Sequence, residues 1–260
     1  MSTKQNIVLI GAGNVATHLG VALIKAGHKI VQVYSPGGKT ARILAKTLDA
    51  EGIGDLKKIR KDADLYLLAV NDDAITDITN TLRLKDKIVV HTSGSVKMHV
   101  LKDSSSNYGV LYPLQTLSKD KKTNLKDIPV CIEANNKATT NKLSVIAKSI
   151  SRNVSEVSSE QRRALHLAAV FACNFSNHMY RIAELILSSE KMSFDLLKPL
   201  IMETAEKIQK ASPAKMQTGP AKRGDAKTIR THLKLLKHDK QLQRIYQLLS
   251  ESIAETDKKL

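Results

Sequence analysis

Small residues near the amino terminus have the spacing of a phosphate-binding turn. The motif Gly-x-Gly-x-x-Ala occupies residues 11–16, directly after the apolar run Ile7–Ile10. Gly11 permits a tight turn out of a strand, and Gly13 lets a pyrophosphate approach the backbone because it has no Cβ. The N–H groups that open the following helix would then face the phosphates. The stretch predicts a dinucleotide site, with a glycine turn that binds no nucleotide as the alternative.

The end of the next predicted strand indicates which dinucleotide is bound. NAD-selective sites place an acidic residue there to hold the ribose 2′-hydroxyl, whereas this chain has Ser35, followed by Lys39 and Arg42. A hydroxyl and two cations suit a 2′-phosphate, because arginine binds phosphate through forked, charge-assisted hydrogen bonds. We therefore expect NADP, the alternative being that Lys39 and Arg42 simply face solvent.

Polar residues follow two further predicted strands, where cofactor and substrate meet in such folds. Val70 and Asn71 are candidate contacts to the cofactor ribose. Ser93 could hydrogen-bond a substrate carbonyl, while Ser95 could do the same or cap a helix. His91 is either an acid/base group or a structural histidine at a strand end.

The second half of the chain offers acid/base and anion-binding residues on helices. His166, Asn174 and His178 lie along a predicted helix of about thirty residues, 158–188, and at about 100° per residue they track one side of it. We expect His166 and Asn174 to serve the reaction, with a satisfied interface residue as the alternative for each and favoured for His178. The turn-rich segment 218–225 contains Arg223 just before a helix, which is an arrangement that binds anions.

These residues require an architecture that alternates strands and helices and then becomes helical. Apolar runs and amphipathic segments alternate up to residue 157, which predicts a Rossmann domain with a mostly parallel sheet and helices on both faces. From residue 158 the pattern is all helical. We expect an NADP-binding domain at 1–157 and a substrate and dimerisation domain at 158–260, with a homodimer formed through the latter.

Composition excludes several classes of protein. The net charge is +16, but the cations are scattered and few aromatic residues accompany them, so nucleic-acid binding is not expected. No apolar run is long enough to span a membrane, and no signal segment precedes the first predicted strand, so we expect a cytoplasmic protein. Cys131 and Cys173 fit no metal or redox spacing, and we expect no metal.

Six stretches together resemble a known superfamily. They are residues 10–16, 68–75, 91–95, 111–116, 166–178 and 218–225. The chain resembles pyrroline-5-carboxylate reductase, 6-phosphogluconate dehydrogenase and the β-hydroxyacid dehydrogenases. It is most similar to Rossmann-like NADP oxidoreductases whose all-helical C-terminal domain has no assigned function. The resemblance implies cofactor contacts at Gly11, Asn14, Val15 and Ser35, a 6-phosphogluconate-dehydrogenase-like C-terminal domain and a dimer.

One departure limits what the resemblance implies about mechanism. β-Hydroxyacid dehydrogenases use a lysine followed four residues later by an asparagine on the first helix of their second domain, and this chain has His166 and Asn174 in that region instead. Pyrroline-5-carboxylate reductase needs little help from protein acids, and here Tyr112, Gln115 and Arg223 could dock an anionic substrate.

The sequence thus predicts an NADP-dependent oxidoreductase acting on a small anionic keto/hydroxy or imino/amino substrate. Ser93, Tyr112 and Asn174 would orient the reacting group, His166 would exchange the proton, and Arg223 would bind the substrate's anion. The alternatives are pyrroline-5-carboxylate reductase itself and an NADP-binding regulator without catalysis.

Overall fold

The computed structural model describes residues 4–118, 121 and 123–258. It divides into two compact units, Met1–His178 and Met179–Leu260. The last strand of the first unit ends at Glu156, beside the domain boundary predicted at residue 157. That boundary stays a prediction, because the first compact unit extends to His178 and so includes the start of the helix that follows.

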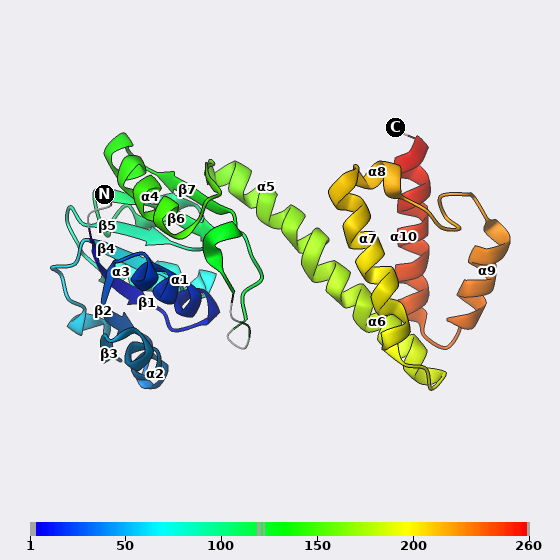
Figure 1. The fold of residues 1–260 in the computed structure, drawn as a ribbon, viewed down its shortest axis with the longest axis horizontal. Coiled ribbons are helices and arrows are strands. Elements are labelled where there is room, and N and C mark those ends of the chain that lie inside the picture. Colours follow the sequence, from blue (N-terminus) through cyan, green and yellow to red (C-terminus); the bar gives the residue numbers. More distant parts are fainter. Residues whose placement is uncertain (1–3, 119–120, 122, 259–260) are drawn as a thin grey trace. The chain divides into compact units, whose positions relative to one another are not determined.

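The first unit is built on one eight-stranded sheet (Figure 1). Its order is β3-β2-β1-β4-β5-β6-β7-β8, and every neighbouring pair is parallel except β6 and β7. The strands are β1 (Asn6–Ile10), β2 (Lys29–Tyr34), β3 (Glu51–Ile53), β4 (Leu65–Leu68), β5 (Ile88–His91), β6 (Asn107–Pro113), β7 (Val130–Ala134) and β8 (Val154–Glu156). The predicted mostly parallel sheet is confirmed, and β3 is an edge strand that the sequence analysis missed.

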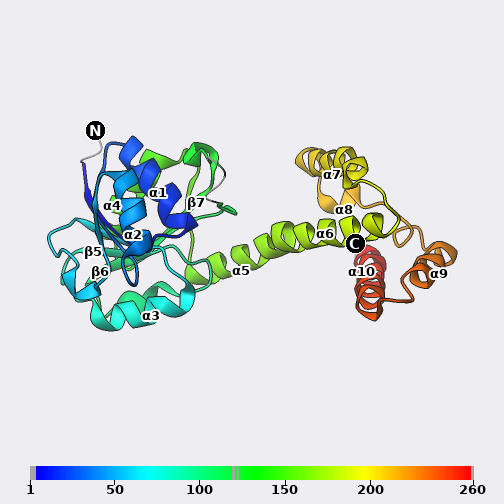
Figure 2. The same cartoon turned by 90° about the horizontal axis from the view of Figure 1, so that it is seen from below.

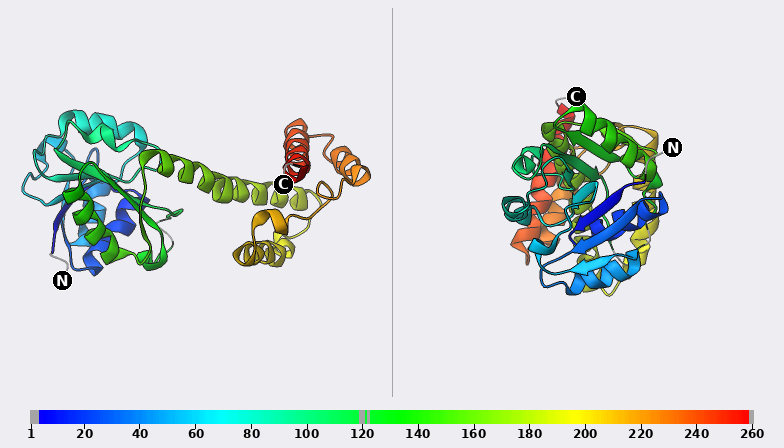
Figure 3. Two further views of the ribbon diagram at one scale, coloured as in Figure 1. Left: turned by 90° about the horizontal axis from the view of Figure 1, so that it is seen from above. Right: turned by 90° about the vertical axis from the view of Figure 1, so that its left-hand side faces the viewer.

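Helices cover both faces of this sheet, as predicted (Figures 2 and 3). One face packs against α1 (Asn14–Lys25), α2 (Lys39–Leu48) and α4 (Lys137–Ile150). The other packs against α3 (Asp72–Thr81) and a short 3₁₀ turn, Met98–Leu101. Burial on both faces explains why the central strands are continuous apolar runs.

The strand order brings the loops that follow β1, β2, β4 and β5 to the carboxyl ends of the parallel strands. β1 lies between β2 and β4, so the chain leaves β1 and β4 toward opposite sides. At such a switch point a crevice forms beyond the carboxyl ends of the strands. The predicted cofactor residues lie in or just after the loops that follow β1, β2 and β4, and Ser93 lies in the loop after β5.

The long helix predicted over 158–188 is present, with a change of winding in its middle. α5 (Ser159–Ala169) continues through a π-helical segment, Val170–Phe175, into α6 (Ser176–Ser189). Ser158 caps α5 in a capping box with Gln161. A π segment winds fewer degrees per residue than an α-helix. The predicted alignment of His166, Asn174 and His178 assumed α-helical winding throughout, and this assumption was wrong.

The second unit is helical, as predicted. Beyond α6 it contains α7 (Lys198–Lys210), α8 (Pro213–Met216), α9 (Ala226–Leu235) and α10 (Lys240–Lys258). Among its described residues only Ala221 is buried. Across the part of the chain that the structure describes, no helix combines the length and apolarity needed to cross a membrane.

Candidate functional site

The two glycines of the fingerprint have different roles in the structure. Gly11 has φ +118°, and a Cβ there would lie 2.1 Å from the carbonyl oxygen of Ala69, the residue after β4, so this position requires a glycine. Gly13 is exposed, and a Cβ on it would meet no atom within 4 Å. The free space beside Gly13, at the start of α1, suits a diphosphate approaching the backbone. Asn14 is exposed and Val15 half-buried in the first turn of the same helix.

A cationic surface forms where α2 begins. A Cβ on Gly38 would lie 2.6 Å from Arg42 Nη1, which places the guanidinium directly against the backbone of the N-cap residue of α2. Lys39 and Arg42 are both exposed, and neither makes an ion pair within the described structure. Two unpaired cations at a helix N-terminus fit the 2′-phosphate of NADP.

Ser35 is built into this surface rather than projecting from it. The side chain is buried, and its hydroxyl oxygen accepts a hydrogen bond from the Ala41 N–H at 2.9 Å and lies 2.7 Å from Thr40 Oγ1. Ser35 therefore anchors the first turn of α2, and its predicted contact with the phosphate stays a prediction. Val70 and Asn71 lie where β4 leads into α3, half-buried and exposed respectively.

The loop after β5 is held by its own polar groups. Ser93 Oγ accepts hydrogen bonds from the N–H groups of Ser95 and Val96, each at 3.0 Å. The Ser93 N–H donates to His91 Nδ1 at 3.2 Å. Ser93, and not Ser95, therefore provides the capping oxygen of this turn, while its own hydroxyl proton remains able to donate to a ligand.

His91 fits neither predicted reading in full, an acid/base group or a satisfied structural histidine, because the ring is fully buried and its Nε2 has no hydrogen-bond partner among the described residues. Burial, together with the positive charge of Arg162, lowers the pKa of His91 to about 3. Its Nδ1 accepts a hydrogen bond, so the ring is neutral. A fully buried neutral imidazole of this kind is no source of protons for a substrate.

The structure brings His166, Tyr112 and the glycine of the β5 loop together. Tyr112 Oη lies 3.1 Å from His166 Nδ1, and the two rings meet edge to face with centroids 6.1 Å apart. A Cβ on Gly94 would lie 2.7 Å from His166 Cγ, so the imidazole is in contact with the loop that contains Ser93. Burial raises the pKa of Tyr112, which keeps the phenol protonated, and its oxygen can accept a hydrogen bond from Nδ1–H. With Nδ1 engaged by Tyr112, the second ring nitrogen, Nε2, is the one that can exchange a proton with a ligand.

The remaining predicted residues are not part of this group. Gln115 is exposed and its Oε1 accepts from the Thr116 N–H at 2.9 Å. Asn174 and His178 are exposed farther along the helix, in the π segment and in α6. Arg223 belongs to the second unit, in the loop before α9, where the Asp225 carboxylate caps the helix through the Thr228 N–H. Their predicted roles stay predictions.

Two residues beside the site were missed by the sequence analysis. Arg162, on α5, is fully buried and forms an ion pair with Glu133 of β7. Arg162 has no local signal, because Arg163 follows it and the two resemble an ordinary basic helix surface. The available hint was the charged residue Glu133 within the otherwise apolar strand β7.

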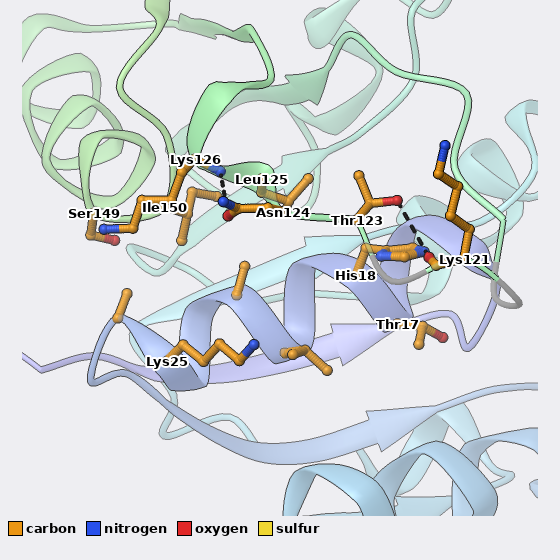
Figure 4. Close-up of a pocket in the computed structure, with 13 residues that line it drawn as sticks. Thr17, His18, Lys25, Lys121, Thr123, Asn124, Leu125, Lys126, Ser149 and Ile150 are labelled. Carbon is orange, nitrogen blue, oxygen red and sulfur yellow. Dashed lines mark hydrogen bonds between the residues drawn. The ribbon is translucent and has the colours of Figure 1, made fainter.

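A separate cavity lies on the outer side of α1 (Figure 4). Its volume is about 520 Å³, and its lining includes His18, Lys25 and Lys126. None of the predicted site residues lines it. The described structure contains no cluster of histidine, cysteine and acidic side chains that could hold a metal ion.

The fold and the site define the class as a Rossmann-type, nicotinamide-dinucleotide-binding oxidoreductase with a helical C-terminal part. Residues 6–94 match the family described as NADP oxidoreductase, coenzyme F420-dependent, and residues 128–253 match a domain of unknown function, DUF2520. The "putative NADP oxidoreductase BF3122" of Bacteroides fragilis is 44% identical, with a TM-score of 0.91 over 97% of this chain and 98% of that one. The chain belongs to this family of NADP oxidoreductases with a DUF2520 domain.

More distant solved structures share the fold. An imine reductase from Myxococcus stipitatus, in complex with NADP⁺, is 16% identical with a TM-score of 0.66, over 98% of this chain and 93% of that one. A 1-pyrroline-5-carboxylate reductase from Streptococcus pyogenes is 12% identical with a TM-score of 0.64, over 99% of each chain. No protein of curated function matches the sequence.

Proposed function

We propose that this protein transfers a hydride between NADP(H) and a small anionic substrate, at a C=O/CH–OH or C=N/CH–NH centre. The observation that carries the proposal is the hydrogen bond of 3.1 Å between Tyr112 Oη and His166 Nδ1, beside the loop that follows β5. It fixes an imidazole next to the sheet edge where the cofactor-binding loops open. NADP(H) supplies the hydride chemistry, and the residues of the chain bind the cofactor and exchange the proton.

In the direction of reduction, one proton must reach the substrate nitrogen or oxygen as the carbon gains a hydride. The imidazolium form of His166 gives that proton from Nε2 and becomes the neutral ring, while its Nδ1–H donates to the Tyr112 hydroxyl oxygen, which fixes the plane of the ring. The half-buried imidazole then recovers a proton from solvent. In the reverse direction the same nitrogen accepts the proton from the alcohol or amine.

Binding and orientation complete the proposal. The Ser93 hydroxyl and the Asn174 amide orient the reacting group, and Gln115 and Arg223 bind the substrate's anion. Support for Ser93 comes from its position one residue before Gly94, which contacts His166. Arg223 is supported by its place in a loop that leads into a helix N-terminus.

Turnover of an NADPH-coupled panel of keto acids and imines, pyrroline-5-carboxylate included, tests this assignment. His166→Gln should lower kcat by about 100-fold or more, the usual contribution of a positioned general acid, with the NADPH dissociation constant unchanged. Tyr112→Phe should lower kcat less. His99→Gln is the matched control, because His99 forms a similar edge-to-face pair with Tyr108 in the same unit.

The result for wild-type protein separates enzyme from regulator. If it binds NADPH but oxidises none with any substrate of the panel, the regulator without catalysis is favoured and the enzymatic proposal fails. Full activity of His166→Gln in a reaction that the wild type catalyses would remove His166 from the mechanism.

We also propose a homodimer formed through the second unit, and a cytoplasmic location. The dimer is supported by large apolar side chains that are exposed on the helices of this unit, such as Leu200 at 62% and Leu248 at 67%. The location is supported by the cysteines, which are both free, one buried and one exposed.

A further inference from the structure

A fully buried arginine connects three elements beside the proposed site. Arg162, on the first turn of α5, donates through Nε to the Ser93 carbonyl oxygen at 3.1 Å and through Nη2 to the Val96 carbonyl oxygen. Its Nη1 donates to Glu133 of β7, whose side chain is 12% exposed. The Glu133 carboxylate also accepts from the N–H and the hydroxyl of Ser159, both at 2.9 Å.

These hydrogen bonds fix the β5 loop relative to α5. The two carbonyl groups that accept from Arg162 belong to Ser93 and Val96, on either side of Gly94. His166 follows Arg162 by four residues, which places it about one helical turn farther along. Its ring contacts Gly94 so closely that an added Cβ would lie 2.7 Å from Cγ and 2.8 Å from Nδ1. The guanidinium therefore sets the separation between the loop and the imidazole.

We propose that Arg162 is a positioning residue: through its fork to the Ser93 and Val96 carbonyls and its ion pair with Glu133, it holds His166 against the β5 loop in the geometry that proton transfer needs. This inference rests on the proposed function of His166. The planar guanidinium reaches two carbonyls and a carboxylate at once, whereas a lysine ammonium offers its protons from a single point. Arg162 itself touches no reacting atom.

Stability alone is a weak reason for this arrangement. Replacing a buried ion pair by apolar side chains of similar size is often neutral or stabilising for folding. The double variant Arg162→Met/Glu133→Leu therefore separates folding from positioning, because it removes both charges together. Arg163→Met/Glu160→Gln is the matched control, an arginine–glutamate pair in the same helical turns whose side chains are 47% and 67% exposed.

The experiment compares kcat, KM, the NADPH dissociation constant and the melting temperature of the full chain. The double variant should fold and bind NADPH like the wild type, while kcat falls by about 100-fold, the usual cost of misplacing a catalytic group by about 1 Å. Gly94→Ala should lower kcat in the same way, because it displaces the same ring from the other side. The control variant should match the wild type throughout.

A second readout does not depend on turnover. The ring proton resonance of His166, assigned by its loss in His166→Gln, should shift in Arg162→Met/Glu133→Leu and stay in place in the control. A folded double variant with wild-type kcat and an unshifted resonance overturns the inference while the proposed function stands. If the wild type has no activity, the proposed function fails, and the resonance still decides on positioning. If the double variant does not fold, Arg162→Lys replaces it, with a lowered kcat and a shifted resonance expected.

Discussion

At the scale of single residues, alanine substitutions at the two fingerprint glycines should have opposite effects: one should impair NADPH binding, and the other the stability of the fold. Gly13→Ala should leave the melting temperature unchanged, because φ is −82° and the new Cβ meets no atom within 4 Å. It should weaken NADPH binding at least about tenfold, since the methyl group occupies the path of the diphosphate.

Gly11→Ala is the matched comparison and should destabilise the fold itself. Its φ of +118° is strained for alanine, and the new Cβ would collide with the Ala69 carbonyl oxygen. Thermal melting and calorimetric titration of both variants with NADPH check the pair. Equal NADPH affinity in Gly13→Ala and the wild type would contradict the diphosphate site.

His91 makes the protein sensitive to acid. Its pKa is about 3 in the folded state and near 6.5 when unfolded. Between these values the unfolded chain binds the extra proton, so the free energy of unfolding should fall as the pH drops from 6.5 toward 3. Above pH 6.5 the His91 ring is neutral in both the folded and the unfolded state, so it causes no loss of stability there.

His91→Asn tests this linkage, because its amide oxygen can accept from the Ser93 N–H in place of Nδ1. Urea unfolding at several pH values between 7 and 4 should show a shallower loss of stability than in the wild type. Identical slopes for the two proteins would show that protonation of His91 does not cause the loss of stability in acid.

At the scale of elements, the start of α2 should select the cofactor. Arg42→Ala should weaken NADPH binding by about 10- to 100-fold, which corresponds to about 1.5–3 kcal/mol for a charge-assisted hydrogen bond. NADH binding should not change, because NADH has no 2′-phosphate. Titration of both cofactors checks this, with Lys46→Ala, in the last turn of α2, as the control. An equal loss for NADH and NADPH would remove Arg42 from the phosphate site.

The elements that the sequence predicted have strong local signals. The first strand was predicted because the apolar run Ile7–Ile10 ends at the glycine turn, and in the structure β1 begins one residue earlier, at Asn6. β3 was missed because it has three residues and contains Gly52, which packs against the Arg42 backbone. The π segment Val170–Phe175 has no sequence signature, since its i→i+5 hydrogen bonds depend on packing along the helix.

The site residues also divide into those with a local sequence signal and those without one. The fingerprint and the cations at α2 are local motifs, and sequence alone placed them. The contact between Tyr112 and His166 joins residues 54 positions apart, and the ion pair of Arg162 with Glu133 joins residues 29 apart. Residue type made His166 and Tyr112 candidates, but only the fold shows that they are partners.

At the scale of the whole molecule, the exposed apolar helices predict a dimer. Leu200→Glu should raise the monomer fraction in light scattering, because the leucine is 62% exposed on α7 and the proposed interface would bury a charge. Ile43→Glu on α2 is the control, since Ile43 is equally exposed, at 65%, in the first unit. A monomeric wild type at every concentration would contradict the proposed dimer.

We propose that this chain moves a hydride between the nicotinamide and a substrate carbon. The most direct measurement uses NADPH carrying deuterium at nicotinamide C4, in both stereochemical forms, with the keto acid and imine panel. One form, and not the other, should transfer its deuterium to the carbon of an alcohol or amine product. NADPH that binds tightly while no product carries the label, with either form and every substrate, would contradict it.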